Sequence, residues 1–292
     1  MAFLNGVDSS AQAVMLVASI LTLLGVTIWV RILPIVRGTT LLATWLWSLA
    51  ALVAIPGVEL GIIYYNLSAG FSAPLRNIAA ILTLCPILSV LGARRPLNRP
   101  WQLIVFSFWV VLTFPAFKTL VLPNPSLQHF EIDKFRLCLV LALTIACGIN
   151  YTRTRFWPNA ALATLSQFAL FAPLITKTPN PASVTLGGFS GLIIAVSLVT
   201  FGFPRKTMAT DALDRRWLNF RNLFGAAWAL RVADQFNKIA VRKQWPVRLG
   251  WNGLVWTEPE TSQTLTSPVN KAMRSLLWRF EDKRSKIQYP FD

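Results

Sequence analysis

The sequence predicts an all-α integral membrane protein, in which a bundle of about seven transmembrane helices precedes a small C-terminal cytosolic domain. Of the 292 residues, 54% are hydrophobic and only 14% are charged, whereas soluble domains carry about 25% charged residues. The apolar residues fall in long runs, and a hydrocarbon core about 30 Å thick requires about 20 apolar residues per helix. The charge is also uneven, because residues 204–292 hold 16 Lys and Arg against 8 Asp and Glu, so this short segment carries half of the net charge of +16.

Seven segments are predicted to cross the membrane, and we expect them to be helices because a spanning segment must satisfy its own backbone polar groups. The predicted spans are residues 11–30, 39–65, 75–93, 101–121, 135–149, 158–175 and 184–203. Pro56-Gly57 lies inside the second span and is expected to break its helix. The chain therefore divides into a polytopic transmembrane domain, residues 1–203, and a basic cytosolic or membrane-surface domain, residues 204–292.

Arginines in the short loops predict the orientation, because Lys and Arg are retained on the cytosolic side of a membrane. They follow the first, third and fifth spans: Arg31, Arg37, Arg94, Arg95, Arg99, Arg153 and Arg155. We therefore expect the N-terminus outside and the C-terminus in the cytosol. The expected location is a cell membrane, such as the bacterial inner membrane.

Residues 204–292 are predicted to form two amphipathic helices and a β-hairpin. Apolar side chains recur at helical spacing from Leu213 to Ile239 and again from Val269 to Phe280. The pair Asn252-Gly253, between alternating apolar residues, predicts the hairpin. Ser267-Pro268 predicts the start of the second helix.

The basic, aromatic-rich C-terminal domain is the predicted contact surface for other molecules. A basic helical face suits anionic lipid headgroups on the cytosolic face, while Trp or Phe enters the acyl boundary. The competing interpretation is that the helices pack into a small domain, or that residues 207–292 bind a protein partner. We do not expect nucleic acid, because no recognised nucleic-acid motif is present. The candidate contact residues are Arg215, Arg216, Trp217, Trp228, Arg231 and Trp278.

Glu59 is the only acidic residue inside a predicted span. A charge in the hydrocarbon region is costly and usually faces the bundle interior or a cavity. Broken helices at membrane depth are typical of transporter sites, so Glu59 is a candidate ligand or coupling residue. The alternative is that Glu59 lies near the outer interface and either reaches water or pairs with Arg76.

Cationic residues stand near the outer ends of the third to sixth spans. If these ends converge, the cations would gather an anionic ligand, and with Glu59 they make up the candidate ligand or coupling site. The alternative is that each cation is an interface anchor whose charged group reaches water independently. The residues of this set are Arg76, Lys118, Arg136 and Lys177.

The sequence shows little catalytic or metal-binding chemistry and names no cofactor. His129 is the only histidine, so bis-histidine haem ligation within one chain is excluded, and no cluster supplies the four ligands of a zinc site. Residues 188–191 resemble the GxSG pattern of rhomboid-type intramembrane proteases, but no histidine base follows the serine. Close helix packing explains these small residues better. The cysteines are expected to be buried: Cys85, Cys138 and Cys147.

These features predict a scaffold or accessory subunit of a membrane complex rather than an enzyme. The alternative is a transporter or permease for a small anionic solute that uses Glu59. A third hypothesis is a membrane enzyme that acts on lipid, with Glu59 beside Ser190 or Cys85.

Overall fold

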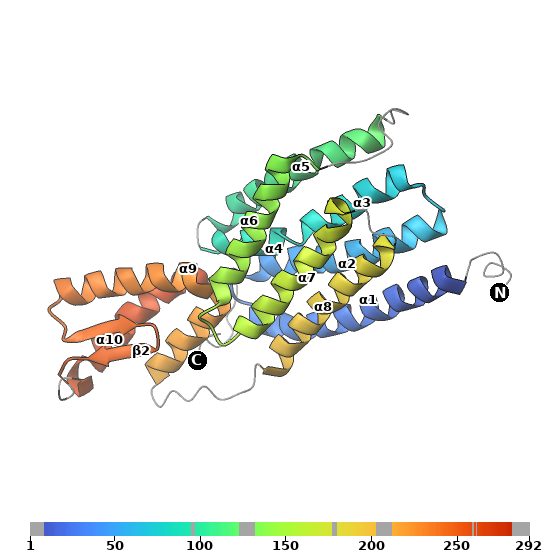
Figure 1. Cartoon of the computed structure of the whole chain (residues 1–292). Coiled ribbons are helices and arrows are strands. Elements are labelled where there is room, and N and C mark those ends of the chain that lie inside the picture. Colours follow the sequence, from blue (N-terminus) through green and yellow to red (C-terminus); the bar gives the residue numbers. More distant parts are fainter. Residues whose placement is uncertain are drawn as a thin grey trace.

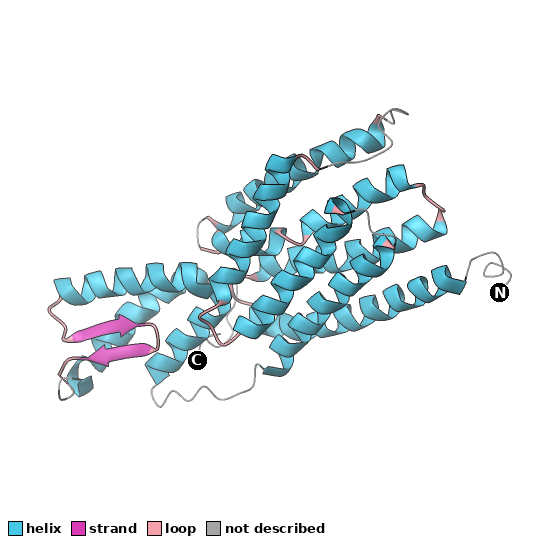
Figure 2. Ribbon diagram, in the orientation of Figure 1, coloured by secondary structure: helices cyan, strands magenta, loops and turns pink. Residues whose placement is uncertain are grey.

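The computed structural model describes residues 9–94, 97–122, 132–176, 180–202, 212–258, 260 and 262–281. Within these residues the chain forms an elongated bundle of helices with a smaller domain at one end (Figures 1 and 2). We call the end of the bundle beside the smaller domain the domain end, and the opposite end the far end. The smaller domain, residues 212–281, is called the C-terminal domain.

Seven spans in the described residues are long and apolar enough to cross a membrane, which confirms the predicted multi-span helical fold. The third span consists of two consecutive helices. The helices are α1 (Ser9–Val36), α2 (Leu42–Tyr64), α3 (Ala69–Leu82), α4 (Cys85–Leu91), α5 (Asn98–Val121), α6 (Lys134–Tyr151), α7 (Trp157–Ile175) and α8 (Pro181–Gly202).

The break predicted at Pro56 is wrong, because α2 continues through that residue as a helix. The interruption lies instead in the third span, where Thr83 and Leu84 separate α3 from α4 and bond to carbonyl groups three residues back. Pro86 stands in the first turn of α4. A backbone N–H group in this turn has no acceptor within the helix, so proline, which has no N–H, costs no hydrogen bond there. In a membrane helix a proline such as Pro56 is tolerated when neighbouring groups compensate for the lost hydrogen bond.

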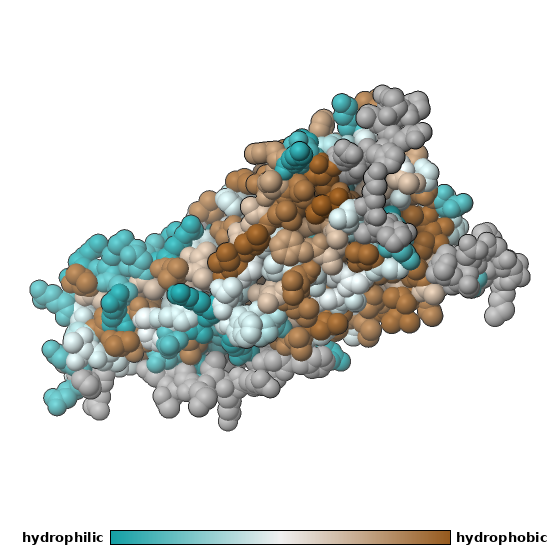
Figure 3. All heavy atoms as spheres, viewed as in Figure 1, coloured by the Kyte–Doolittle hydropathy of each residue, from teal (hydrophilic) through white to brown (hydrophobic). Residues whose placement is uncertain are grey.

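The outward faces of the spans are apolar, as Figure 3 shows over the bundle. Large side chains such as Leu23, Leu103 and Leu165 are at least 65% exposed. Cys138 on α6 is exposed as well, so the expectation that all three cysteines are buried is wrong for this residue, although Cys85 and Cys147 are buried. An apolar run does not by itself distinguish a lipid-facing position from a bundle-facing one, which explains the error.

Helices α7 and α8 pack closely where the GxSG-like residues lie. A Cβ atom at Gly188 would lie 2.9 Å from the Ser166 carbonyl oxygen, and one at Gly191 would overlap the Ser166 hydroxyl. The hydroxyl of Ser190 donates to the Gly187 carbonyl oxygen at 2.8 Å. Small residues therefore allow the close approach that was predicted for this segment.

The C-terminal domain consists of α9 (Ala212–Arg242), β1 (Val247–Gly250), β2 (Gly253–Trp256), α10 (Ser262–Leu277) and the short 3₁₀ helix η3 (Trp278–Phe280). The predicted apolar stripe of α9 is buried, and Trp217, Phe220 and Phe236 are completely inaccessible. The predicted hairpin is also present. Its turn is Trp251-Asn252, one residue earlier than predicted, because Gly250 pairs with Gly253.

The second helix of this domain, α10, begins at Ser262 and not at Ser267-Pro268 as predicted. Pro268 therefore lies inside the helix, where a proline normally costs stability. Val269 and Met273 on the same helix are completely buried. Leu265, which lies in the added turn, also packs against the core, so burial of apolar surface favours the longer helix despite the proline.

The largest apolar cluster joins the C-terminal domain to the bundle. Phe280 stands at its centre, with its ring 4.8 Å from that of Phe220, 5.0 Å from that of Phe224 and 5.1 Å from that of Trp228. The bundle contributes six buried residues to the same cluster: Ile32, Val36, Leu41, Trp45, Val90 and Ala93. The two parts of the described chain therefore share one core at the domain end.

Candidate functional site

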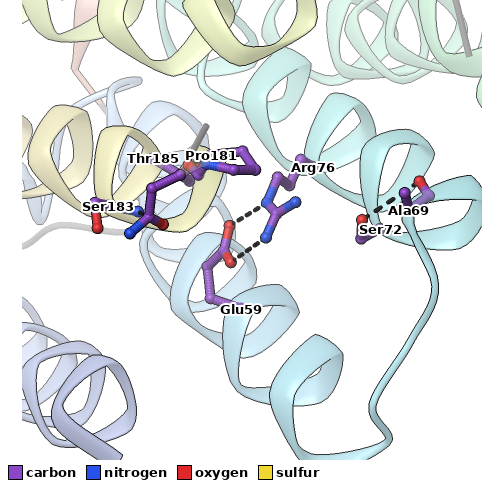
Figure 4. Close-up of polar contacts among 8 residues, drawn as sticks. Glu59, Ala69, Ser72, Arg76, Pro181, Ser183 and Thr185 are labelled. Carbon is purple, nitrogen blue, oxygen red and sulfur yellow. Dashed lines mark hydrogen bonds and ion pairs between the residues drawn. The ribbon is translucent and has the colours of Figure 1, made fainter. Parts of the chain in front are cut away.

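Glu59 and Arg76 form a buried, bidentate ion pair between α2 and α3 (Figure 4). Arg76 Nε donates to Glu59 Oε1 at 2.7 Å, and Arg76 Nη2 donates to Glu59 Oε2 at 2.8 Å. The Glu59 side chain is 0% exposed and that of Arg76 is 9% exposed. The interpretation that Glu59 pairs with Arg76 is therefore confirmed, and both carboxylate oxygens accept a charge-assisted hydrogen bond.

Asn77, the residue after Arg76, is buried, and its Oδ1 has no hydrogen-bond partner among the described residues. It lines a cavity of about 10 Å³ at the far end, together with Asp133 and Arg136. A volume of this size holds about one water molecule. The first turn of α8 is drawn next to the ion pair in Figure 4, and α8 contacts α2.

The other cations predicted near the outer ends of the spans differ in their surroundings. Lys118, in the last turn of α5, is exposed. Arg136 is partly buried against the small cavity beside Asn77. Lys177 lies outside the described residues, and Arg76 is engaged by Glu59.

At the domain end, the C-terminal domain binds the loop between α1 and α2. The Thr40 backbone N–H donates to the Phe280 carbonyl oxygen at 3.0 Å, and the Thr40 hydroxyl donates to the Ala93 carbonyl oxygen at 2.6 Å. Thr39 and Glu281 form an isolated antiparallel bridge. The loop after the first helix is thus paired with the last described residues.

The C-terminal domain also binds the bundle next to the two other arginine-bearing loops. The indole of Trp228 donates to the Val90 carbonyl oxygen at 2.8 Å, and that of Trp251 donates to the Arg153 carbonyl oxygen at 2.9 Å. The Tyr151 hydroxyl donates to the Leu223 carbonyl oxygen at 3.2 Å. The domain is therefore attached to the bundle near three of its loops.

A sharp bend in α9 fits around Asn150 of α6. Gly225 has φ +76° and ψ −176°, a conformation that is open almost only to glycine. A Cβ atom there would overlap the Asn150 amide. The Asn150 Oδ1 accepts the Ala227 backbone N–H at 2.9 Å, so a side chain of the bundle caps the second half of α9 as an N-cap residue would.

The six predicted contact residues for lipid or protein divide into two groups. Arg216, Trp217 and Trp228 are at most 8% exposed, which places their side chains inside the protein. Arg216 Nη1 donates to Asn270 Oδ1 at 3.2 Å. The exposed members are Arg215, Arg231 and Trp278.

Arg221 is a buried cation that the sequence did not reveal. Its Nη1 donates to the Trp251 carbonyl oxygen at 2.8 Å, and its guanidinium lies 5.0 Å from the centre of the Trp251 ring. Removal from water lowers the pKa of Arg221 below its ordinary value. An arginine next to the apolar stripe of α9 was the only sequence signal, and its burial depends on the hairpin that covers it.

A second cavity, of about 280 Å³, lies between α9 and the spans at the domain end, and we call it the chamber. Its wall includes apolar residues from five spans and α9, among them Trp29, Ile32, Ile87, Ala163, Val199 and Leu223. Its polar residues Asn159 and Gln167 bind backbone carbonyl oxygens, at Ala195 and at Thr83 in the break between α3 and α4. No sequence motif marks this space, because its wall is assembled from distant segments.

The described residues contain no group of three or more His, Cys, Asp or Glu side chains that could hold a metal ion, and His129 lies outside them. The chain matches no family model, no curated protein and no solved structure.

Proposed function

We propose that the protein is a scaffold or accessory subunit of a membrane complex, which presents its C-terminal domain as a rigid platform. The observation that carries the proposal is the attachment of this domain at three places around the domain end, through Thr40, Trp228 and Trp251. A domain on a flexible tether would change its orientation, whereas a domain that shares a core with the spans keeps it. A fixed orientation reduces the ordering cost of binding a partner in the same membrane.

The location of the arginines supports a cytosolic position for the platform. The seven loop arginines follow the spans that end at the domain end, and cytosolic loops retain Lys and Arg. Residues 204–292 add a net charge of +8, from 16 basic and 8 acidic residues. In this orientation the platform faces anionic lipid, or the acidic surface of a partner, on the cytosolic side of the cell membrane.

The outer surface of the platform offers large apolar side chains between charged ones. Val241 is 80% exposed, Val255 62%, Leu230 60% and Trp278 53%. Arg231 is exposed beside Leu230 and lies 5.0 Å over the Trp228 ring. Exposed Trp and Arg are the residue types most enriched among those that dominate protein interfaces.

The test is mild extraction of the full chain from native membranes, followed by measurement of the mass and stoichiometry of the complex. We expect a protein partner at a fixed ratio. Trp278→Ala should reduce the bound partner about tenfold or more, since a dominant interface residue contributes about 2 kcal/mol. The matched control is Tyr65→Ala, because Tyr65 lies at the far end and is 71% exposed. Equal partner recovery in both variants would reject the platform surface.

Transport of a small anion through a site at Glu59 remains the second candidate, and the buried ion pair is its support. The candidate is weaker because Glu59 is completely buried and Arg76 occupies both of its oxygens. If transport is the function, Glu59→Gln abolishes uptake while the protein is still made at the normal level. If the scaffold proposal is correct, Glu59→Gln lowers the stability but leaves the partner ratio of the folded fraction unchanged.

Lipid chemistry at Glu59 is the third candidate, and it has the least support. The Ser190 hydroxyl is bound to the Gly187 carbonyl oxygen, and Cys85 lies in an apolar cluster with Ala51, Leu82 and Val105. Assay for a lipid product, with Glu59→Gln as the inactive control, tests this candidate separately from uptake.

A further inference from the structure

The chamber is a sizeable open space among the described residues, and small side chains form part of its wall. Ala160, Ala163 and Ala195 are among its wall residues. Its volume of about 280 Å³ compares with about 10–15 Å³ for one water molecule on the same measure. It lies just below the range of about 300–1,000 Å³ that is typical of small-molecule sites.

The wall of the chamber favours an apolar occupant. Trp29, Ile32, Val199 and Leu223 contribute apolar surface, and the amide of Gln167 is engaged by the Thr83 carbonyl oxygen. Water held there would find few partners, and an ordered buried water makes about three hydrogen bonds. A hydrocarbon chain would bury apolar surface of its own, at about 25 cal/mol per Å².

The position of the chamber identifies the source of such a chain. Five of the helices that line it belong to membrane spans, and the sixth, α9, covers it at the domain end. The chamber is open rather than sealed, and the outward faces of the surrounding spans are apolar (Figure 3). The nearest hydrocarbon to such an opening is the acyl chain of a membrane lipid.

The charge around the domain end identifies the headgroup. Arg31 and Arg37 flank two wall residues of α1, Ile32 and Val36, in the sequence, and both arginines are exposed. The Arg155 guanidinium lies 4.8 Å over the ring of Phe156, another wall residue. The loop segments 31–41, 92–100 and 151–158 contain no acidic residue. This charge suits a phosphate that has no compensating cation of its own.

We propose that the chamber binds one acyl chain of an anionic phospholipid, whose headgroup lies among the arginines of the domain end. The lipid fills the space between the spans and α9 and completes the interface between the bundle and the C-terminal domain. This proposal is independent of the scaffold function, because a transporter or an enzyme of this structure would contain the same chamber.

The test uses the full chain in vesicles that contain phosphatidylglycerol with a photoreactive diazirine in its acyl chain. After illumination, we expect labelled peptides that include residues 147–163 and 195–199. Ala163→Phe fills the chamber from α7 and should lower this labelling about fivefold or more, which corresponds to about 1 kcal/mol. Val199→Phe, from the α8 wall, should give the same loss. Agreement between the two variants would show that the loss does not come from misfolding of one of them.

The matched control is Ala161→Phe, since Ala161 is an exposed residue two positions away on α7 that does not line the chamber. Its labelling should equal that of the unmodified chain. Equal labelling in Ala163→Phe, Val199→Phe and the control would overturn the proposal. So would equal labelling by a phosphatidylcholine probe with the same photoreactive chain, because its zwitterionic headgroup lacks the net charge that the arginines select.

Discussion

At the residue scale, the Glu59–Arg76 pair is a structural link between α2 and α3 in the apolar part of the protein. Transfer of each charge out of water costs several kcal/mol, and the attraction between the charges offsets this only when the geometry is good. Two parallel hydrogen bonds of 2.7 and 2.8 Å supply that geometry. The energetic consequence is asymmetric, because loss of one partner leaves the other charge buried alone.

Glu59→Gln should therefore destabilise the protein by about 3–5 kcal/mol, since it leaves the Arg76 charge uncompensated. The double variant Glu59→Leu with Arg76→Met should regain most of that loss, because apolar groups of similar size replace both charges. Thermal unfolding in detergent measures both effects. A single variant that is as stable as the unmodified protein would show that the pair contributes nothing.

Single residues were predictable from the sequence when a charged side chain interrupted an apolar segment. Glu59 was identifiable because it is an acid in an apolar run, and Arg76 was its natural partner. Arg221 was not, because other arginines on α9, such as Arg215, are exposed and only the hairpin buries this one. Burial depends on the neighbours that the fold supplies, which a residue type alone does not indicate.

At the element scale, the bend in α9 positions the C-terminal domain on the bundle. The positive φ of Gly225 turns the chain beside Asn150, and the carboxamide of Asn150 then caps the second half of the helix. Buried aromatic residues lie on both sides of the bend, at Phe224 and Trp228. Because of the bend, the apolar residues before and after Gly225 both pack into the core that the C-terminal domain shares with the bundle.

Gly225→Ala should weaken this docking, because alanine is strained at this φ and its Cβ atom would overlap Asn150. The expected loss of stability is at least about 1–3 kcal/mol from the backbone strain alone. Faster amide hydrogen exchange in residues 226–232, measured by mass spectrometry, reports the lost cap. Gly61→Ala is the control, since nothing lies within 4 Å of a Cβ atom there, and its exchange should not change.

Elements that are determined by neighbouring residues in the sequence were well predicted. Elements that are determined by packing between distant segments were not. The apolar stripe of α9 and the hairpin signal at Asn252-Gly253 depend on nearest neighbours in the sequence. Pro56, Pro86 and Pro268 were harder, because the same residue occurs inside α2, at the start of α4 and inside α10. Packing on each helix determines whether a proline ends it.

At the scale of the whole molecule, the bundle and the C-terminal domain share one apolar core at the domain end. Composition divided the chain near residue 203, since charge increases sharply there. The shared core could not be predicted from that division, because it consists of residues from α1, α2 and α4 packed on α9, α10 and η3. The sequence therefore indicated the parts of the molecule but not the interface between them.

Deletion of residues 207–292 should consequently do more than remove a binding surface. It uncovers Ile32, Val36, Trp45 and Val90, which are at most 9% exposed in the full chain. We expect the spans to insert, but the truncated protein to have a lower melting temperature and to aggregate in detergent. Size-exclusion chromatography and thermal unfolding measure this, with full-length Trp278→Ala as the control. A monodisperse truncated protein with an unchanged melting temperature would contradict the shared core.

The hydrogen bond from Thr40 to Phe280 has a consequence for biosynthesis. The two residues are 240 positions apart, which a ribosome needs on the order of 10–50 s to translate. For that time the loop between α1 and α2 lacks its final cover. Only a chain elongated beyond Phe280 can form this contact, so a chain that terminates earlier leaves the Thr40 backbone N–H without that acceptor.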